Sequence, residues 1–274
     1  MKTQMYYCIA KTAQLVEVLE AYKIKYKTFE MRPNEPYVTF YVFKEDEAWT
    51  QLEKILPPKP AHGLVFNDEE LLNAKWLKLR STCMKIDSRN PDTFSYICPK
   101  NPESPKINKY HQTQVLPFSF SPVKWSNNNH FYSTYEGGYE MIFCDDFAKT
   151  FLLENRLRGL EFRNVIWHKK GCVLPNVYQM FFKNELPREA IIPDSRAKEI
   201  RCPYCGKIQY FCYNDARLGI KEEYLSEDVD FYITPEMFGE VGVYAIPIVS
   251  SRVYTALKNA GMTRNLNFEP VVLF

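Results

Sequence analysis

The sequence is poor in glycine, histidine and net charge. Its 274 residues include 10 Gly and 4 His, and the formal net charge is +2. Few glycines leave little material for a phosphate-binding loop, and neither a dinucleotide-binding fingerprint nor a serine nucleophile elbow is present. A charge near zero gives no electrostatic reason to expect nucleic acid, an anionic membrane or a strongly acidic ligand. The histidines form no sequence-local metal or acid–base cluster, because no two of them share a short spacing: His62, His111, His130 and His168.

Long apolar segments are also missing. No stretch approaches the roughly 18 apolar residues needed to span a bilayer, and residues 1–14 lack the apolar core of a signal peptide. The 8 cysteines lie at irregular spacings and do not resemble the disulfide framework of a small secreted protein. We therefore expect reduced thiols in a cytoplasmic protein that has no membrane partner.

Aromatic residues are abundant, with 19 Phe, 19 Tyr and 4 Trp, and they favour strands and broad packed surfaces. At the N-terminus, apolar periodicity predicts the order strand, helix, strand, strand, helix. This βαββα order is most of a ferredoxin-like unit, and it stops at the Pro-Pro-Lys-Pro run of residues 57–60. The predicted elements cover residues 5–10, 12–22, 24–29, 37–43 and 45–56.

The sequence predicts an α+β protein with three parts: a ferredoxin-like N-terminal region over residues 1–86, a crossing segment over 87–130, and a larger mixed α/β domain over 131–274. A short helix capped by Asn67 or Asp68 lies near the end of the first part. The crossing segment is rich in Pro, Asn and Ser. The last part begins with a hairpin, because two strand-like runs flank a Glu-Gly-Gly turn.

The C-terminal domain contains two strand–helix–strand echoes. Residues 142–166 align without gaps with residues 248–272, an offset of 106. The alignment places, at the same position of both copies, a residue whose side-chain oxygen is suited to a helix N-cap. It also pairs Gly with Asn, the residues that most readily adopt left-handed backbone angles. The aligned pairs are Asp145 with Ser251, Asn155 with Gly261, and Gly159 with Asn265.

The best local motif is Cys-Pro-Tyr-Cys-Gly at residues 202–206. Such a turn is the usual half-site of a zinc knuckle, in which the glycine lets backbone N–H groups face sulfur. The same turn also suits a metal-free knuckle held by packing and hydrogen bonds. A proline inside the pair and a glycine behind it disfavour a thioredoxin-like redox pair. The candidate zinc ligands are Cys202 and Cys205, with Cys212 as a third and Cys172 or Cys98 as a fourth.

Three further patterns each allow two interpretations. In the run Cys144-Asp145-Asp146, Cys144 could be a nucleophile with acidic neighbours. The run lies where a strand is expected to meet a helix, however, and this position explains Asp145 better as an N-cap. Aromatic and basic residues at 106–111 and 118–139 could stack on single-stranded nucleic acid, although strand packing is favoured. An acidic run is usually a solvated face, and it is also a candidate for docking a basic partner. Its members are Glu222, Glu223, Glu227, Asp228 and Asp230.

Six short segments of the C-terminal half carry a resemblance to a known family: residues 158–162, 178–180, 186–187, 202–206, 248–252 and 267–271. On these segments, residues from about 137 to 274 resemble the bacterial double-CXXCG-motif proteins and related immunity proteins of polymorphic toxin systems. The resemblance covers about half of the chain. That family has two CXXCG motifs, and this chain has one. The resemblance implies an immunity-type binding protein.

The sequence therefore favours a non-catalytic binding protein that covers the active surface of a cognate toxin. Such a protein needs a rigid scaffold and a complementary patch. The alternative is a zinc-ribbon-like nucleic-acid-binding or regulatory module in which Cys202 and Cys205 bind metal. A third class is an enzyme assembled from distant segments. It would show a deep pocket containing carboxylates or cysteines with shifted pKa values.

Overall fold

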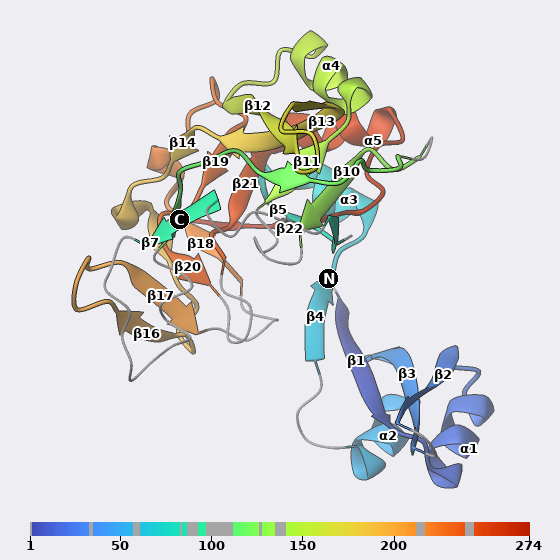
Figure 1. Ribbon diagram of the computed structural model, residues 1–274. Coiled ribbons are helices and arrows are strands. Elements are labelled where there is room, and N and C mark those ends of the chain that lie inside the picture. Colours follow the sequence, from blue (N-terminus) through green and yellow to red (C-terminus); the bar gives the residue numbers. More distant parts are fainter. Residues whose placement is uncertain are drawn as a thin grey trace. The chain divides into compact units, whose positions relative to one another are not determined.

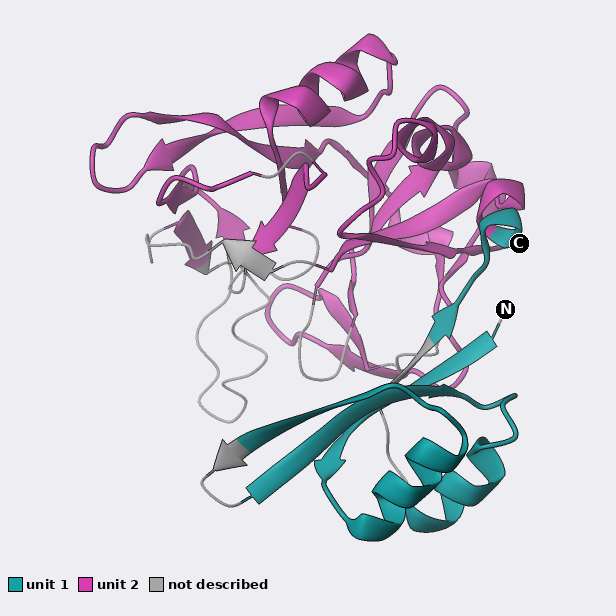
Figure 2. Ribbon diagram, turned by 90° about the vertical axis from the view of Figure 1, so that its right-hand side faces the viewer, with its two compact units in different colours: residues 1–70 teal, residues 71–274 magenta. Residues whose placement is uncertain are grey.

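The chain divides into two compact units, residues 1–70 and 71–274 (Figure 2). Both combine helices and strands, which confirms the α+β class. The computed structural model describes residues 2–32, 35–56, 61–82, 84–86, 93–96, 112–125, 128–134, 141–211, 217–238 and 244–274.

The N-terminal unit is a complete ferredoxin-like βαββαβ fold (Figure 1). Its sheet is antiparallel throughout, with the order β2-β3-β1-β4. The fourth strand has the sequence Ala-His-Gly-Leu-Val, which carries no alternating apolar pattern and was therefore not predicted. The elements are β1 (Lys2–Ala10), α1 (Ala13–Ala21), β2 (Tyr26–Arg32), β3 (Glu35–Phe43), α2 (Trp49–Ile55) and β4 (Ala61–Val65).

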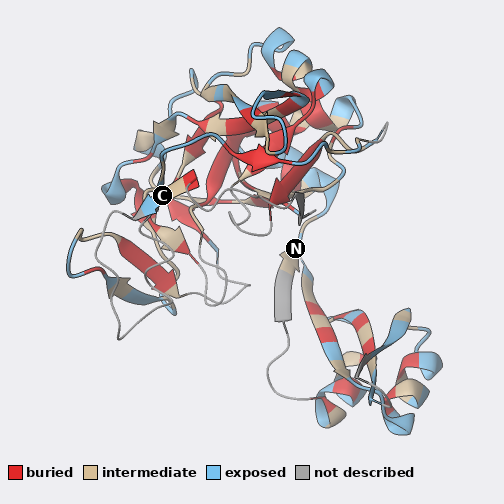
Figure 3. Cartoon of the chain, in the orientation of Figure 1, coloured by how far each residue is buried: buried red, intermediate tan, exposed pale blue. Residues whose placement is uncertain are grey.

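Both helices of this unit pack on one face of the sheet. Alternate residues of β1 and β3, such as Tyr7 and Phe40, point inward and contact Leu15 and Leu19 of α1 and Leu52 of α2. In the middle of these strands, buried residues accordingly alternate with partly or fully exposed ones (Figure 3). Neither helix covers the opposite face of the sheet (Figure 2).

The larger unit contains the remaining elements, and α3 (Asp68–Asn73) spans the boundary between the two units. Asn67 caps α3 as predicted, because its Oδ1 accepts the Glu70 N–H at 2.8 Å. The elements that follow are β5 (Trp76–Ser81), β6 (Met84–Ile86), β7 (Phe94–Tyr96), β8 (Gln112–Gln114), β9 (Ser119–Phe120), β10 (Phe131–Thr134), β11 (Ile142–Cys144), α4 (Asp146–Glu154), β12 (Leu160–Trp167), β13 (Val173–Phe182), β14 (Asn184–Glu185), the 3₁₀ helix η3 (Arg188–Ala190), β15 (Ile191–Ile192), β16 (Lys198–Arg201), β17 (Ile208–Phe211), β18 (Gly219–Ile220), the 3₁₀ helix η4 (Glu222–Tyr224), β19 (Phe231–Ile233), β20 (Met237–Phe238), β21 (Pro247–Ser250), α5 (Ser251–Asn259), β22 (Leu266–Pro270) and β23 (Val272–Leu273).

Two sheets dominate the larger unit. One has six strands in the order β6-β10-β11-β13-β12-β9, and the other has five in the order β14-β19-β21-β5-β22. Smaller sheets are formed by β15-β18-β23, β16-β17-β20 and β7-β8. The antiparallel pairing of β10 with β11 confirms the strands of the predicted hairpin, and the predicted turn at residues 136–138 lies outside the described residues. Aromatic residues of the first sheet, including Phe118, Tyr132 and Phe143, pack in its core, whereas residues 106–111 lie outside the described residues.

The two large sheets repeat one arrangement of four strands and a helix. In the first copy α4 connects β11 to β12, β13 lies between these strands, and β10 lies outside β11. In the second copy α5 connects β21 to β22, β5 lies between them, and β19 lies outside β21. All of these neighbours are antiparallel. The strand registers also agree. Gln179 of the central strand β13 lies opposite Phe143 of β11, and Lys78 of the central strand β5 lies opposite Ile248 of β21.

The two helices correspond with an offset of 105. Ser250 is the N-cap of α5, so the predicted cap Ser251 is wrong and Ser250 corresponds to Asp145. Both helices have 9 residues and end in the same Schellman hydrogen bond. The second copy has one additional residue in the turn before β22, so β22 lies at the predicted offset of 106 from β12, whereas β21 lies at the offset of 105 from β11. The equivalent bonds run from Leu157 N–H to the Leu152 carbonyl (3.2 Å) and from Met262 N–H to the Leu257 carbonyl (2.8 Å).

Left-handed residues end both helices, as predicted, but one prediction is wrong. Gly159, Gly261 and Asn265 have φ values of +114°, +68° and +67°. Asn155 has φ of −75°, and Arg156 takes the left-handed position with φ of +55°. The ungapped alignment misplaced this residue because it shifted the first helix by one position.

The second copy obtains its central strand from the start of the larger unit. β5 lies within residues 1–86, which the sequence grouped with the N-terminal region, yet it pairs with both β21 and β22. Residues 142–272 therefore do not complete the repeat without β5 and β10. A second echo in the sequence marks the outer strands: Phe-Tyr-Ser-Thr at residues 131–134 and Phe-Tyr-Ile-Thr at residues 231–234.

Candidate functional sites

The Cys-Pro-Tyr-Cys-Gly motif forms the turn between the antiparallel strands β16 and β17. Cys202 N–H donates to the Lys207 carbonyl (2.8 Å), Gly206 N–H donates to the Cys202 carbonyl (3.0 Å), and Gly206 has φ of +69°. Tyr204 N–H donates to Cys202 Sγ at 3.4 Å. N–H groups around a metal site often orient and stabilise the metal-bound ligands, and the same contact also suits a metal-free turn. The turn therefore has the form of half a zinc site.

Zinc binding at this turn stays a prediction. Cys202 is buried and Cys205 is partly exposed, so the turn offers two of the four ligands that a structural zinc site needs. No group of three or more His, Cys, Asp or Glu side chains among the described residues could hold a metal ion. Cys172 is exposed just before β13. Cys212 and Cys98 lie outside the described residues.

The acidic segment, residues 222–228, lies on the surface of the larger unit. Lys75 Nζ lies 2.6 Å from Glu222 Oε1, and Arg158 Nη1 lies 3.1 Å from Asp228 Oδ1. Glu223 and Glu227 form no ion pair with another described residue. Four of the five predicted acidic side chains are therefore exposed: Glu222, Glu223, Glu227 and Asp228.

The backbone of the acidic segment is held at several points. Glu222 N–H donates to the Phe274 carbonyl (3.0 Å), and Ser226 N–H donates to Tyr232 Oη (2.9 Å). Between these points, Leu225 packs against the core of the larger unit. The exposed carboxylates are thus presented by an anchored chain segment.

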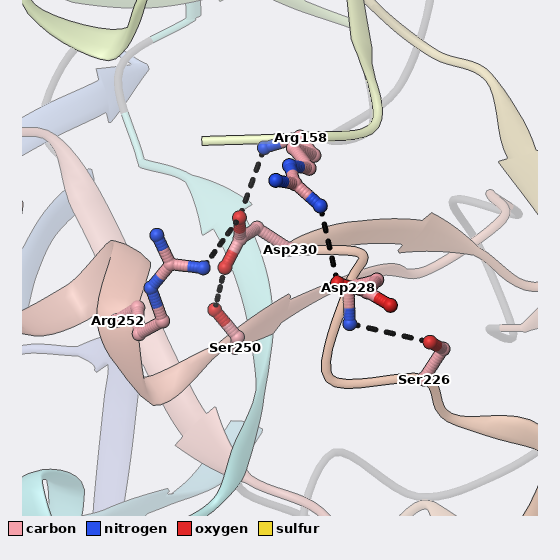
Figure 4. A network of polar contacts seen from close by, with 6 residues as sticks. All are labelled: Arg158, Ser226, Asp228, Asp230, Ser250 and Arg252. Carbon is pink, nitrogen blue, oxygen red and sulfur yellow. Dashed lines mark hydrogen bonds and ion pairs between the residues drawn. The ribbon is translucent and has the colours of Figure 1, made fainter. Parts of the chain in front are cut away.

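Asp230 corrects the predicted acidic patch, because it is fully buried. Its Oδ1 accepts a hydrogen bond from Ser250 Oγ (2.6 Å), and its Oδ2 accepts one from Arg158 N–H (2.9 Å) (Figure 4). Arg252 Nη1 lies 3.4 Å from Oδ2. Arg158 belongs to the first copy, whereas Ser250 and Arg252 belong to the second. Asp230 therefore connects the two copies and presents no surface to a partner.

His130 occupies in the first copy the position that Asp230 has in the second, directly before the outer strand. Its Nδ1 lies 2.9 Å from Asp145 Oδ2, while Asp145 Oδ1 accepts the Ala148 N–H at 2.8 Å. The predicted N-cap role of Asp145 is confirmed. In both copies the N-cap side chain bonds the residue before the neighbouring strand. No short spacing in the sequence indicates this pair, because His130 and Asp145 are 15 residues apart.

Cys144 lies beside Asp145 but cannot act as a thiolate nucleophile. It is fully buried, and burial together with the adjacent carboxylate raises the pKa of its thiol well above the ordinary value. The sulfur therefore stays protonated at neutral pH. The structure thus agrees with the interpretation of Asp145 as a helix cap.

Glu236 is a buried carboxylate that no sequence pattern indicated. Burial raises its pKa, and Arg188, whose Nε lies 3.1 Å from Glu236 Oε1, opposes that shift. This contact lacks hydrogen-bond geometry, since neither carboxylate oxygen has a hydrogen-bond partner in the described part of the chain. A shifted pKa alone does not define a catalytic site. The observed contact is that of an ion pair between a buried acid and a partly exposed arginine.

No model of a known protein family matches the chain, and a search of curated proteins finds no significant match. In the described residues, every helix is too short or too polar to cross a membrane.

Proposed function

We propose that this is a non-catalytic binding protein of the immunity type, which neutralises a cognate bacterial toxin by direct contact. The observation that supports this proposal is the acidic segment, where four exposed carboxylates lie on an anchored backbone. An ordered surface loses less conformational freedom on binding than a mobile one. Its negative charge attracts and orients a basic partner. A toxin surface rich in Lys and Arg fits these properties.

The other polar groups support the role of a scaffold. Asp145 caps α4 and bonds His130, whereas Asp230 connects the two copies. These acids are occupied by contacts that hold the fold together. A binding protein requires a rigid, complementary surface and no catalytic group. The resemblance of residues 137–274 to immunity proteins points to the same function.

Co-expression with the product of the neighbouring gene is the first test. The proposal requires protection of the cells and co-purification of the two proteins. If neither occurs, toxin neutralisation is rejected. If the two proteins bind, substitutions in the acidic segment determine whether that segment is the contact surface.

The double substitution Glu223→Gln and Glu227→Gln removes two exposed carboxylates that form no ion pair with described residues. We expect about 2- to 10-fold weaker binding, mainly through slower association, with a smaller difference at high salt. The matched control is Glu17→Gln with Glu53→Gln, which removes the same charge from exposed positions of α1 and α2. Equal effects of the two double variants would show that another surface makes the contact.

The hairpin of β16 and β17 supports a second candidate function, a zinc-ribbon-like nucleic-acid-binding or regulatory module. The observation in its favour is the Tyr204 N–H that donates to Cys202 Sγ. This candidate requires stoichiometric zinc in the purified protein, measured by elemental analysis, and salt-sensitive binding to nucleic acid. Cys205→Ser is expected to lower the zinc content. Absence of both zinc and nucleic-acid binding removes this candidate.

A further inference from the structure

The open face of the N-terminal sheet, opposite α1 and α2, carries a row of aromatic rings. Because Tyr7 and Phe40 point toward the helices, their neighbours in β1 and β3 point to the open face. Tyr41 is 57% exposed and Phe29 is 40% exposed. The rings on this face are Tyr6, Phe29, Tyr37, Tyr41 and Phe43.

Four of these rings form two cross-strand pairs. Tyr6 lies opposite Tyr41, and their ring centroids are 4.9 Å apart. Phe29 lies opposite Tyr37, and their centroids are 6.2 Å apart. Tyr37 and Tyr41 are four residues apart on β3, so the two pairs are separated by about 13 Å along the strand. The face therefore offers two aromatic positions on neighbouring strands.

Lysines accompany the rings. A groove of about 690 Å³ lies next to the first ring pair and is lined by Tyr6, Tyr41, Lys25, Lys27 and Thr39 among others. Lys27 pairs with Thr39, which lies between Tyr37 and Tyr41 on β3. The outward positions nearest the rings contain neither an acidic residue nor Leu, Ile, Val or Met: residues 2, 4, 6 and 8 of β1, 27 and 29 of β2, and 37, 39, 41 and 43 of β3. By the same alternation, the ends of the strands add Glu35 of β3 and Val65 of β4, which lies opposite Lys2.

We infer that this face binds single-stranded nucleic acid, with bases stacked on the ring pairs and phosphates near Lys25 and Lys27. Exposed aromatic rings accept the flat face of any base. Four-stranded sheets with aromatic residues on their strands stack two or three bases in this way. Lysine is depleted in protein–protein interfaces, so its presence between the rings favours a phosphate-bearing ligand.

The near-zero charge of the whole chain does not describe this face. Several acidic residues of the same unit, such as Glu17 and Glu53, lie in α1 and α2, which cover the other side of the sheet, whereas Glu35 lies at the end of β3, away from the ring pair of Tyr6 and Tyr41. Few lysines also mean few phosphate contacts, so we expect moderate affinity and a small dependence on salt. Stacking then supplies most of the binding energy. This site is separate from the acidic segment proposed to bind a toxin.

The test uses the full-length protein and fluorescently labelled oligonucleotides of mixed sequence: single-stranded RNA, single-stranded DNA and the matching duplex. Fluorescence anisotropy is expected to show binding of a single strand in preference to the duplex. Tyr41→Ala is expected to weaken that binding about 5- to 100-fold, the effect of losing one stacked base. Tyr41→Phe retains the ring and should retain most of the affinity. The preference for RNA or DNA identifies the natural ligand class.

Tyr22→Ala is the matched control, since Tyr22 is 41% exposed at the end of α1 and does not belong to the ring pairs. Lys27→Ala is expected to lower the affinity and to reduce the salt dependence by about one phosphate contact. Circular dichroism of each variant establishes that the fold is retained, which we expect because Tyr41 is largely exposed.

Three outcomes would overturn the inference. The first is the absence of single-strand binding at about 100 µM protein, the weak end of non-specific nucleic-acid binding. The second is an equal effect of Tyr41→Ala and Tyr22→Ala. The third is an interaction with the cognate protein that Tyr41→Ala weakens while no oligonucleotide binds, which would make the face a protein interface. None of these results depends on the Glu223 and Glu227 variants, so toxin neutralisation is tested separately.

Discussion

Replacement of Asp230 measures how strongly the cluster in Figure 4 holds the two copies together. Asp230→Ala removes the acceptor of two short hydrogen bonds, from Ser250 Oγ (2.6 Å) and Arg158 N–H (2.9 Å), and of a longer one from Arg252 Nη1 (3.4 Å). A hydrogen bond to a charged group contributes about 1.5–3 kcal/mol. The contact with Arg252, whose side chain is 56% exposed, adds little. We expect the free energy of unfolding to fall by about 3–5 kcal/mol, the usual cost of removing one partner from a buried pair.

Asp230→Asn separates hydrogen bonding from charge. The amide oxygen can accept the Arg158 N–H while the amide nitrogen donates to Ser250 Oγ, so we expect a loss of only about 1 kcal/mol. Asp228→Ala is the control, because Asp228 is 87% exposed and its replacement should change stability by about 0.5 kcal/mol or less. Urea unfolding followed by tryptophan fluorescence gives the midpoints and slopes of all three variants. Equal midpoints for Asp230→Ala and Asp228→Ala would refute the reasoning.

Three further predictions concern a glycine, a thiol and a carboxylate. We expect Gly159→Ala to destabilise the protein more than Gly261→Ala. At Gly261, which has φ of +68°, the cost is that of a left-handed backbone for alanine, about 1–2 kcal/mol, and the added Cβ would have no atom within 4 Å. At Gly159 the added Cβ would also lie 2.6 Å from the Phe231 carbonyl oxygen. Equal urea midpoints of the two variants would contradict this prediction. In native protein, mass spectrometry after iodoacetamide treatment should find exposed Cys8 and Cys172 modified well before Cys144, whose burial raises the pKa of its thiol; early modification of Cys144 would count against that account. Hydrogen bonds from Arg196 lower the pKa of the Asp194 carboxyl from 3.8 to about 2. The stabilising contribution of the Asp194 carboxylate is therefore complete above the ordinary pKa and is lost as the pH falls through about 2. In Arg196→Gln, a carboxyl NMR titration should show this pKa return toward its ordinary value, and an unchanged pKa would exclude the Arg196 side chain as the cause.

Helix starts and tight turns could be predicted from the sequence because their signals are local. Asn67 caps α3, and Asp145 caps α4 through the N–H of a residue three positions later. The Cys-Pro-Tyr-Cys-Gly turn likewise folds as its own residues dictate, with the left-handed backbone at Gly206. In these cases donor and acceptor lie within a few residues, so the spacing in the sequence is enough to identify them.

The position of α5 and the partners of β5 could not be predicted in the same way. In the sequence, Ser250 and Ser251 are both suitable N-caps. In the structure the helix begins at Ser251, so Ser250 is the N-cap, and its Oγ donates a hydrogen bond to Asp230, 20 residues earlier. β5 is separated from β21 by more than 160 residues, and no local pattern records that pairing. Long-range strand partners depend on which edges remain available after the rest of the sheet has formed.

The candidate surfaces likewise combine local features that the sequence determines with long-range features that it does not. The sequence by itself determined the alternation of rings along β1 and β3 and the charge of the acidic run, because both are properties of neighbouring residues. Only the tertiary structure decided which alternate positions face α1 and α2 and which face the solvent. It also decided that Asp228 is exposed while Asp230, two residues later, is buried. The physical reason is that burial depends on Arg158, 72 residues earlier in the chain, which approaches Asp230 only when both copies are folded.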